Sequence, residues 1–238
     1  MRNPNSLTSG ETVSEATLSG VLGDALQRLA GLDRAFTSPE AAERGVSART
    51  LERLVHAQAI WRVAHGVYVP GAMLPDARTY IAEAALRFPG AVICLRDAAK
   101  LHGLTTEDRE EATLAMSAEF RPRPARLGNA VDGFKPVRWM RWTAKSLKEG
   151  ISTETVHGVQ IQVTNPTRTV IDYFRYGDDG NGRGGSRTLF DRSEVVSVLD
   201  RYLDGRDRDP ALMKMAADFK IRDVIAPLIE GRRSLTSR

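Results

Sequence analysis

Residues 36–71, FTSPEAAERGVSARTLERLVHAQAIWRVAHGVYVPG, predict the fold of the first third of the chain. Ser38 is a good helix N-cap, and Gly45 ends the short helix that follows it. Ser47 caps a second helix, which the sequence predicts over residues 48–58. Because only a tight turn separates the two helices, the pair is typical of a helix-turn-helix.

The segments on either side of this pair predict a winged helix-turn-helix. Before it, apolar residues recur every three or four positions over residues 18–29, which predicts an amphipathic helix. After it, residues 60–63 and 67–69 predict two short strands around Gly66, whose permissive backbone suits a hairpin loop. Helix, short helix, turn, helix and hairpin is the element order of a winged helix-turn-helix.

The second helix predicts how this unit would contact DNA. Leu51, Leu54 and Val55 share one face, so we expect that face to pack inward and the opposite face to lie in solvent. In a helix-turn-helix the start of the second helix enters the major groove, where arginine holds guanine through two hydrogen bonds. The hairpin is expected to lie against the flanking phosphates. The candidate DNA-contacting residues are Ser47, Arg49, Thr50 and Arg53 on the helix and Arg62 and His65 on the hairpin.

Two interpretations of this unit stay open at the level of the sequence. Residues 35–70 are almost neutral, with four arginines against three glutamates, and winged helices also serve as protein-docking modules. We favour DNA binding, because Glu40 and Glu43 belong to the first of the two helices and need not face a duplex.

The rest of the chain predicts a second, larger domain of mixed α and β structure, so that the fold class is α+β. We expect a flexible tail over residues 1–17, the winged helix-turn-helix domain over 18–75 and the larger domain over 76–238, with a glycine-rich loop at 177–187. Expected in the larger domain are helices at 78–88, 97–102, 166–176, 193–203, 210–217 and 221–229, strands at 92–95, 113–116 and 137–142, and a hairpin at 156–163.

Composition restricts the classes of protein that the chain can belong to. Its 238 residues carry a net charge of +4 and are 42% hydrophobic, which is ordinary for a soluble globular protein. No apolar run reaches the roughly 18 residues of a membrane-spanning helix, and the polar N-terminus lacks the apolar core of a secretory signal. We therefore expect a cytoplasmic protein without membrane contact. Cys94, the one cysteine, lies in an apolar run and is expected to be buried.

One segment carries the basic excess of the chain. Residues 121–148 hold eight basic residues and one acid, Asp132. The stretch VRWMRWTAK, residues 137–145, is compatible with stacking on bases or with a sheet whose tryptophans are partly core, and for the tryptophans we favour the second interpretation. Auxiliary contacts to nucleic acid or to a partner are expected from Arg121, Arg123, Arg126, Lys145 and Lys148.

The sequence contains no recognisable catalytic constellation. The four histidines lack metal-binding spacing, and neither a Gly-x-Ser-x-Gly elbow nor a phosphate-binding Gly-x-x-x-x-Gly-Lys loop occurs. Arg168 and Asp172, four residues apart on one predicted helix, are interpreted as a structural ion pair. We therefore expect no catalytic residue, no metal and no cofactor.

Three stretches in series point to a known family. The first is residues 36–71, which ends in a Gly-Val-Tyr motif. The second is VICLRDAAKLHGLT, residues 92–105, a predicted strand and helix that end in His-Gly-Leu. The third is VTNPTRTVIDYF, residues 163–174, with a Pro-x-Arg-Thr-x-x-Asp block. In this order the three stretches resemble the AbiE-type antitoxin family of bacterial type IV toxin–antitoxin systems.

The resemblance implies a two-domain antitoxin linked to abortive phage infection. Its N-terminal domain would repress its own operon by binding inverted repeats in double-stranded operator DNA, as a homodimer or as monomers that bind cooperatively. Its larger domain would counteract a nucleotidyltransferase toxin, without a required stable complex. The alternative is a protein- or RNA-binding module that uses residues 121–148 and binds no operator.

Overall fold

The computed structural model describes residues 15–107, 110–129, 133–177, 188–204 and 209–236. The chain divides into two units, Met1–Pro75 and Asp76–Arg238, here called unit 1 and unit 2. Both units contain helices and strands, so the predicted α+β fold class is confirmed. Of the tail expected over residues 1–17, residues 1–14 lie outside the described residues, and Glu15 already begins the first helix.

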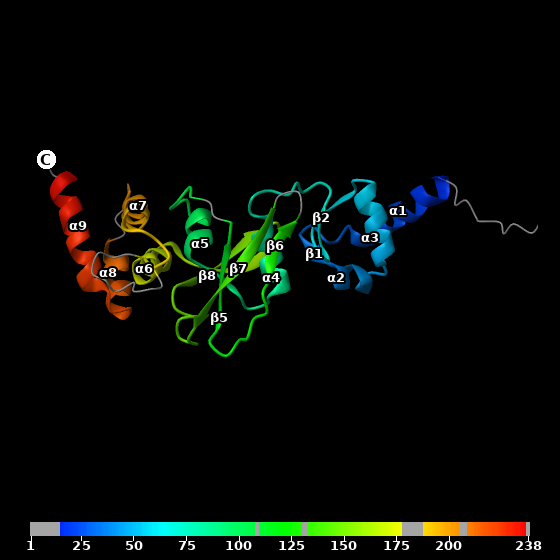
Figure 1. Ribbon diagram of the computed structural model, residues 1–238. Coiled ribbons are helices and arrows are strands. Elements are labelled where there is room, and N and C mark those ends of the chain that lie inside the picture. The colour runs from blue at the N-terminus through cyan, green and yellow to red at the C-terminus, as the bar shows by residue number, and fades with distance from the viewer. Residues whose placement is uncertain (1–14, 108–109, 130–132, 178–187, 205–208, 237–238) are drawn as a thin grey trace, which may run out of the picture. The chain divides into compact units, whose positions relative to one another are not determined.

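Unit 1 has the predicted winged helix-turn-helix order, with one additional strand (Figure 1). Its elements are α1 (Glu15–Leu29), β1 (Phe36–Thr37), α2 (Ser38–Glu43), α3 (Ala48–His56), β2 (Ile60–Ala64) and β3 (Val67–Pro70). The three strands form an antiparallel sheet in the order β1-β3-β2. The sequence did not predict β1, because two residues are too few to show an alternating pattern.

A hydrophobic core joins α1 and α3 to this sheet. Leu51 and Leu54 have no exposed surface, as predicted for the inner face of α3, and Val55 packs at the margin of the same core. Phe36 of β1 and Tyr68 of β3 stack within it, with ring centroids 5.8 Å apart. Because burial of each leucine contributes about 1.5–3 kcal/mol, this core fixes which face of α3 is turned to solvent.

Helix α2 begins one residue earlier than predicted. Thr37, not Ser38, is its N-cap. The Thr37 hydroxyl accepts a hydrogen bond from the Glu40 backbone N–H at 3.4 Å, and the Glu40 carboxylate accepts one from the Thr37 N–H at 2.7 Å. This reciprocal capping box has a Thr-x-x-Glu signature. The prediction was wrong because it used the Ser-Pro pair and ignored that spacing.

Unit 2 is built around a six-stranded mixed sheet in the order β6-β7-β5-β4-β9-β8. Its strands are β4 (Val92–Ile93), β5 (Ala112–Ser117), β6 (Arg126–Asn129), β7 (Gly133–Trp142), β8 (Ile151–Val156) and β9 (Val159–Thr164). Its helices are α4 (Thr79–Arg87), α5 (Leu95–Leu101), α6 (Pro166–Tyr176), α7 (Arg192–Leu203), α8 (Asp209–Asp218) and α9 (Arg222–Thr236). β4 pairs in parallel with β9, as β5 does with β7, and the other neighbours are antiparallel.

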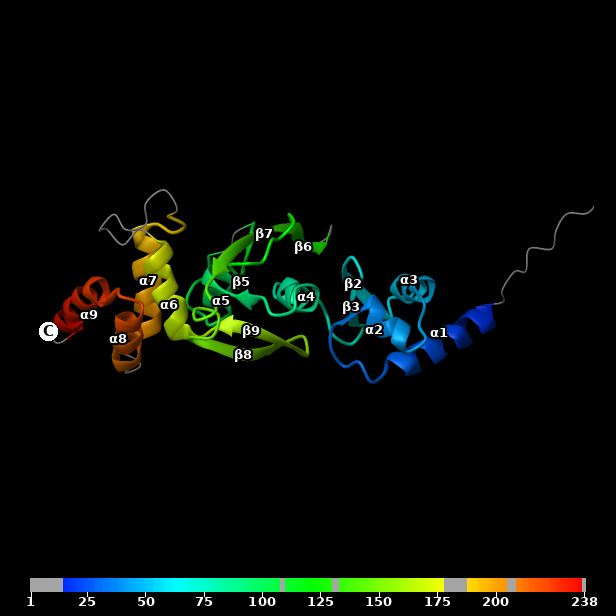
Figure 2. The ribbon, with the colours of Figure 1, turned by 90° about the horizontal axis from the view of Figure 1, so that it is seen from below.

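Helices cover both faces of the sheet in unit 2. On one face, Phe88 at the end of α4 packs edge-on against Trp139 of β7, with ring centroids 4.9 Å apart. On the other face, Trp142 is 3% exposed and shares a core with residues of α5 to α9. Figure 2 shows α6, α7, α8 and α9 gathered beyond one end of the strands. Both tryptophans therefore have packing roles, as favoured from the sequence.

Helix α6 matches its predicted bounds and contains the predicted ion pair. Asn165 caps the helix by accepting a hydrogen bond from the Arg168 N–H at 2.8 Å. Arg168 Nε donates to Asp172 at 2.9 Å, and both side chains are fully buried. Arg168 also donates to the carbonyls of Ser146 and Glu149, at 3.0 and 2.6 Å. The pair is therefore structural and ties the segment after β7 to α6.

Helix α5 differs from its prediction. The sequence predicted a strand over residues 92–95 and a helix from Asp97, whereas the strand ends at Ile93 and the helix begins at Leu95. Leu95 has a φ of 55°, which turns the chain out of the sheet. Cys94, at this junction, is fully buried as expected.

The predicted hairpin turn at His157 and Gly158 is present. Both residues have positive φ, 46° and 71°, as in a type I′ turn, and the first strand begins earlier than predicted, at Ile151. The glycine-rich loop expected at residues 177–187 lies outside the described residues, except for Gly177.

Candidate nucleic-acid interface

Helix α3 turns a polar face to solvent. Arg49 is exposed, and Arg53, one turn later, is partly exposed. Within the described part of the chain, neither guanidinium forms an ion pair or a hydrogen bond. The buried Leu51 and Leu54 hold the opposite face, so both arginines are accessible to a ligand from outside the molecule.

Ser47 and Thr50 begin the helix and remain able to bind a ligand. Ser47 Oγ accepts a hydrogen bond from the Thr50 N–H at 3.2 Å and lies 2.9 Å from Thr50 Oγ1. One of the two hydroxyl protons forms the hydrogen bond between these side chains, so the other hydroxyl proton can be donated to a ligand. Ser47 is exposed, and the positive end of the helix dipole lies at the same place. An anion is therefore favoured beside these hydroxyls.

The sequence analysis missed two residues of the exposed face of α3. Glu52 and Arg53 come three and four residues after Arg49, and His56 comes four and three residues after these two, which places all of them on one side of a helix. Glu52 and His56 are both exposed. A glutamate at such a position can accept a hydrogen bond from the amino group of cytosine. The spacing is a signal present in the sequence, but it extends beyond the start of the helix, where a helix-turn-helix is expected to meet base edges.

The hairpin of unit 1 brings Arg62 and His65 together. Arg62 Nη2 lies 3.3 Å from His65 Nδ1, and both side chains are exposed. The turn passes through Gly66, which has a φ of 71°, a conformation that favours glycine. The Gly66 carbonyl accepts a hydrogen bond from the Ser38 N–H at 2.9 Å. The hairpin tip is therefore fixed to the start of α2.

The negative charge of Glu40 is compensated inside unit 1. Arg34 Nη2 donates to its carboxylate at 2.5 Å, next to the bond from Thr37. Burial raises the pKa of Glu40, but the hydrogen bonds from Arg34 and Thr37 outweigh it and hold the pKa below its ordinary value of 4.5. Glu40 is therefore an anion with its own cation beside it.

The five auxiliary residues are exposed but do not gather at one place. Arg121 and Lys145 each follow one strand of the parallel pair β5 and β7, so both lie at the same end of the sheet. Arg126 pairs opposite Pro136, six residues and about 20 Å of strand before Trp142. Exposed side chains of this set are Arg121, Arg123, Arg126, Lys145 and Lys148.

Two further features of the described residues bear on the class of site. In those ranges, no three His, Cys, Asp or Glu side chains group in a way that could hold a metal ion. No helix in them combines the length and the apolar character needed to cross a bilayer. What α3 and the hairpin offer a ligand is a set of guanidinium, hydroxyl and imidazole groups together with the carboxylate of Glu52.

The fold of unit 1 and the exposed face of α3 define the class of protein as a winged helix-turn-helix. Residues 24–71, from α1 through β3, match the family described as "Transcriptional regulator, AbiEi antitoxin". The resemblance to AbiE-type antitoxins is thereby confirmed for this part of the chain. The stretches at 92–105 and 163–174 lie outside the matched range. No curated protein matches the chain.

Proposed function

We propose that this protein represses its own operon by placing α3 in the major groove of operator DNA. The observation that carries the proposal is the pair Arg49 and Arg53, which have no ion-pair or hydrogen-bond partner among the described residues and lie on a helix anchored by Leu51 and Leu54. Arginines in this place suit bidentate recognition of guanine. The family match over residues 24–71 supports a regulator of transcription.

The hairpin and the start of α3 complete the proposed interface. Arg62 and His65 contact the flanking phosphates, and Ser47 and Thr50 contact phosphate or base. Phosphate contacts fix the position of the protein, and the α3 arginines supply the preference for sequence. Because one unit reads one half-site, two copies bind an inverted repeat, as a homodimer or cooperatively. The proposal requires no contact from residues 121–148.

A gel shift with the DNA upstream of the protein's own gene tests this proposal. The double variant Arg49→Ala, Arg53→Ala is expected to bind about 100-fold more weakly, because each arginine–guanine pair contributes about 1–3 kcal/mol. Its circular dichroism should be unchanged, since neither side chain belongs to the core. Arg201→Ala, at an exposed position of α7, is the matched control and should bind normally. Equal binding by the double variant and the wild type would refute the proposal.

We further propose that unit 2 counteracts a nucleotidyltransferase toxin. The family description as an antitoxin supports this role, together with the resemblance of residues 92–105 and 163–174 to that family. Co-expression of this protein with a nucleotidyltransferase encoded beside its own gene is expected to relieve the growth arrest that the nucleotidyltransferase causes. The Arg49→Ala, Arg53→Ala variant, expressed from a foreign promoter, should relieve it equally, because operator contact belongs to unit 1.

A further inference from the structure

The second half of β7 has a neighbour on one side only. β5 pairs with β7 from Val137 to Trp142, whereas β6 pairs with it only from Gly133 to Pro136. On the β6 side, residues 138–142 therefore form a sheet edge with no paired strand in the described part of the chain.

Two backbone hydrogen bonds establish which backbone groups point out of this edge. The Val137 N–H donates to the Ala125 carbonyl on the β6 side, and the Trp142 carbonyl accepts from Ala118 on the β5 side. In a parallel pair, the N–H and C=O of one residue point to the same neighbour and those of the next residue point away. By this alternation, Trp139 and Arg141 direct their N–H and C=O groups out of the open edge.

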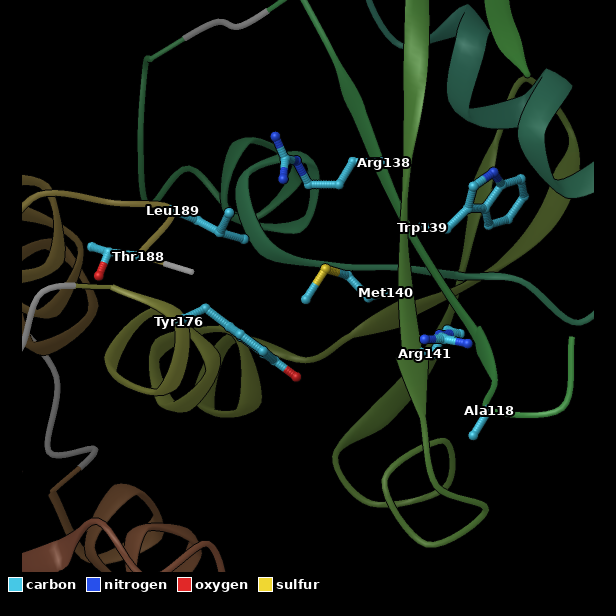
Figure 3. Close-up of a pocket in the computed structure, with 8 residues that line it drawn as sticks. All are labelled: Ala118, Arg138, Trp139, Met140, Arg141, Tyr176, Thr188 and Leu189. Carbon is cyan, nitrogen blue, oxygen red and sulfur yellow. The ribbon is translucent and has the colours of Figure 1, made fainter. Parts of the chain in front are cut away.

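A groove runs along this edge, with a volume of about 840 Å³. Four consecutive residues of β7, Arg138 to Arg141, line it, together with Tyr176 at the end of α6 and Leu189 before α7. Figure 3 shows Arg138 and Met140 on the side toward Tyr176 and Leu189, and Trp139 and Arg141 on the opposite side. Because successive residues of one strand line it, the groove follows the backbone rather than one face of the sheet.

The two sides of the groove differ in chemistry. Met140, Leu189 and the ring of Tyr176 offer apolar surface on one side, and the charge of Arg138 on that side is balanced by Glu111, 2.6 Å away. On the other side, Arg141 is exposed and has no ion-pair partner among the described residues. Arg121, also exposed, donates to the carbonyl of Ala118, which lines the groove. An occupant with carboxylates on one face and apolar groups on the other would match both sides.

We infer that this edge of β7 binds an extended acidic segment of a partner protein as an added strand. An unpaired strand edge binds a peptide through main-chain hydrogen bonds, and alternate side chains of the peptide then fall on opposite faces. The segment places apolar side chains against Met140 and Leu189 and carboxylates beside Arg141. Charge complementarity with the exposed Arg141 and Arg121 selects an acidic partner.

The test uses the full chain and a fluorescein-labelled peptide, acetyl-Asp-Val-Glu-Val-Asp-Val-Glu-Val-amide, with binding measured by fluorescence anisotropy. One control peptide carries N-methyl groups on alternate amides, which blocks main-chain pairing. A second control peptide has lysine in place of each acid. The wild type is expected to bind the acidic peptide and neither control. Operator contact by unit 1 plays no part in this assay. A failure of the present inference is therefore distinguishable from a failure of the proposed function.

Two variants of one exposed residue test the two parts of the inference. Arg141→Glu reverses the charge, and Arg141→Pro removes an N–H that does not face β5. Each is expected to weaken binding by about tenfold or more, which corresponds to loss of an ion pair or a main-chain hydrogen bond. Arg201→Glu makes the same charge change on α7 and should leave binding within about twofold. If Arg141→Pro does not fold, the charge variant at this exposed position still decides the matter.

Three results would overturn the inference. The first is no saturable binding of the acidic peptide by the wild type. The second is equal binding of the N-methylated peptide, or of the acidic peptide by Arg141→Glu. The third is displacement of the peptide by a thymidine octanucleotide that binds more tightly than the peptide and depends on Arg141. This result would assign the edge to nucleic acid.

Discussion

Arg168 is a charged residue held entirely inside unit 2. Its guanidinium lies 4.5 Å from the ring of Trp142 and 4.4 Å from that of Phe219. Asp172 accepts hydrogen bonds from Arg168 at 2.9 Å and from Arg175 at 2.8 Å. Asp172 is thus the anion that balances two cations, one of them without access to water.

Removal of the Asp172 charge is expected to destabilise unit 2 strongly. Asp172→Asn leaves the buried Arg168 cation without a counter-charge, which costs about 3–5 kcal/mol. The measurement is the free energy of unfolding in urea. Asp200→Asn is the control, because Asp200 pairs with Arg232 at the surface and should cost less than about 1 kcal/mol. Similar losses for the two variants would show that burial of the pair is unimportant.

Helix α3 and the hairpin of unit 1 are expected to make different kinds of contact with DNA. α3 carries Arg49 and Arg53, which we propose contact base edges, whereas the hairpin carries Arg62 and His65 near its turn. Contacts to bases discriminate between sequences, and contacts to phosphates do not.

Changes in the hairpin are therefore expected to weaken operator and random DNA alike. Arg62→Ala should reduce both affinities by a similar factor and lower the slope of log affinity against log salt by about 1. Arg49→Ala should instead weaken the operator more than random DNA. Both effects can be measured by titrations at several salt concentrations. A larger loss of sequence preference in Arg62→Ala than in Arg49→Ala would reverse the assigned roles.

Each of the two units has its own hydrophobic core. The core under α3 is made of residues of unit 1, and the core that contains Trp142 is made of residues of unit 2. A substitution that destabilises one core is thus expected to leave the stability of the other unit unchanged.

A cavity in the core of unit 1 is expected to lower the stability of that unit alone. Leu54→Ala removes a side chain with no exposed surface, at a cost of about 2–5 kcal/mol. Calorimetry should show the unit 1 transition lowered by about 10 °C or more, with the unit 2 transition in place. Val21→Ala, at a position 46% exposed, is the control and should have little effect. A common shift of both transitions by Leu54→Ala would contradict the separation of the cores.

The elements that the sequence predicted well are those with local signals. α6 was predicted to the residue, because Asn165 caps it and Pro166 suits its first turn. α3 was placed by Ser47 in the same way, although it ends at His56 rather than residue 58. The N-cap of α2 also has a local signal, the Thr-x-x-Glu spacing of Thr37 and Glu40, although the predicted cap was Ser38.

The winged helix-turn-helix and the solvent-facing arginines of α3 are predictable from the sequence alone, because caps, turns and helical periodicity act between residues close together in the chain. The folded structure was needed to establish the order of the six strands of unit 2, the pairing of β1 and β6, and the open edge of β7. Strand pairing joins distant segments, and its free energy depends on neighbours that no local pattern specifies. For the same reason the basic residues of 121–148, which look like one patch in the sequence, lie at separate places on unit 2.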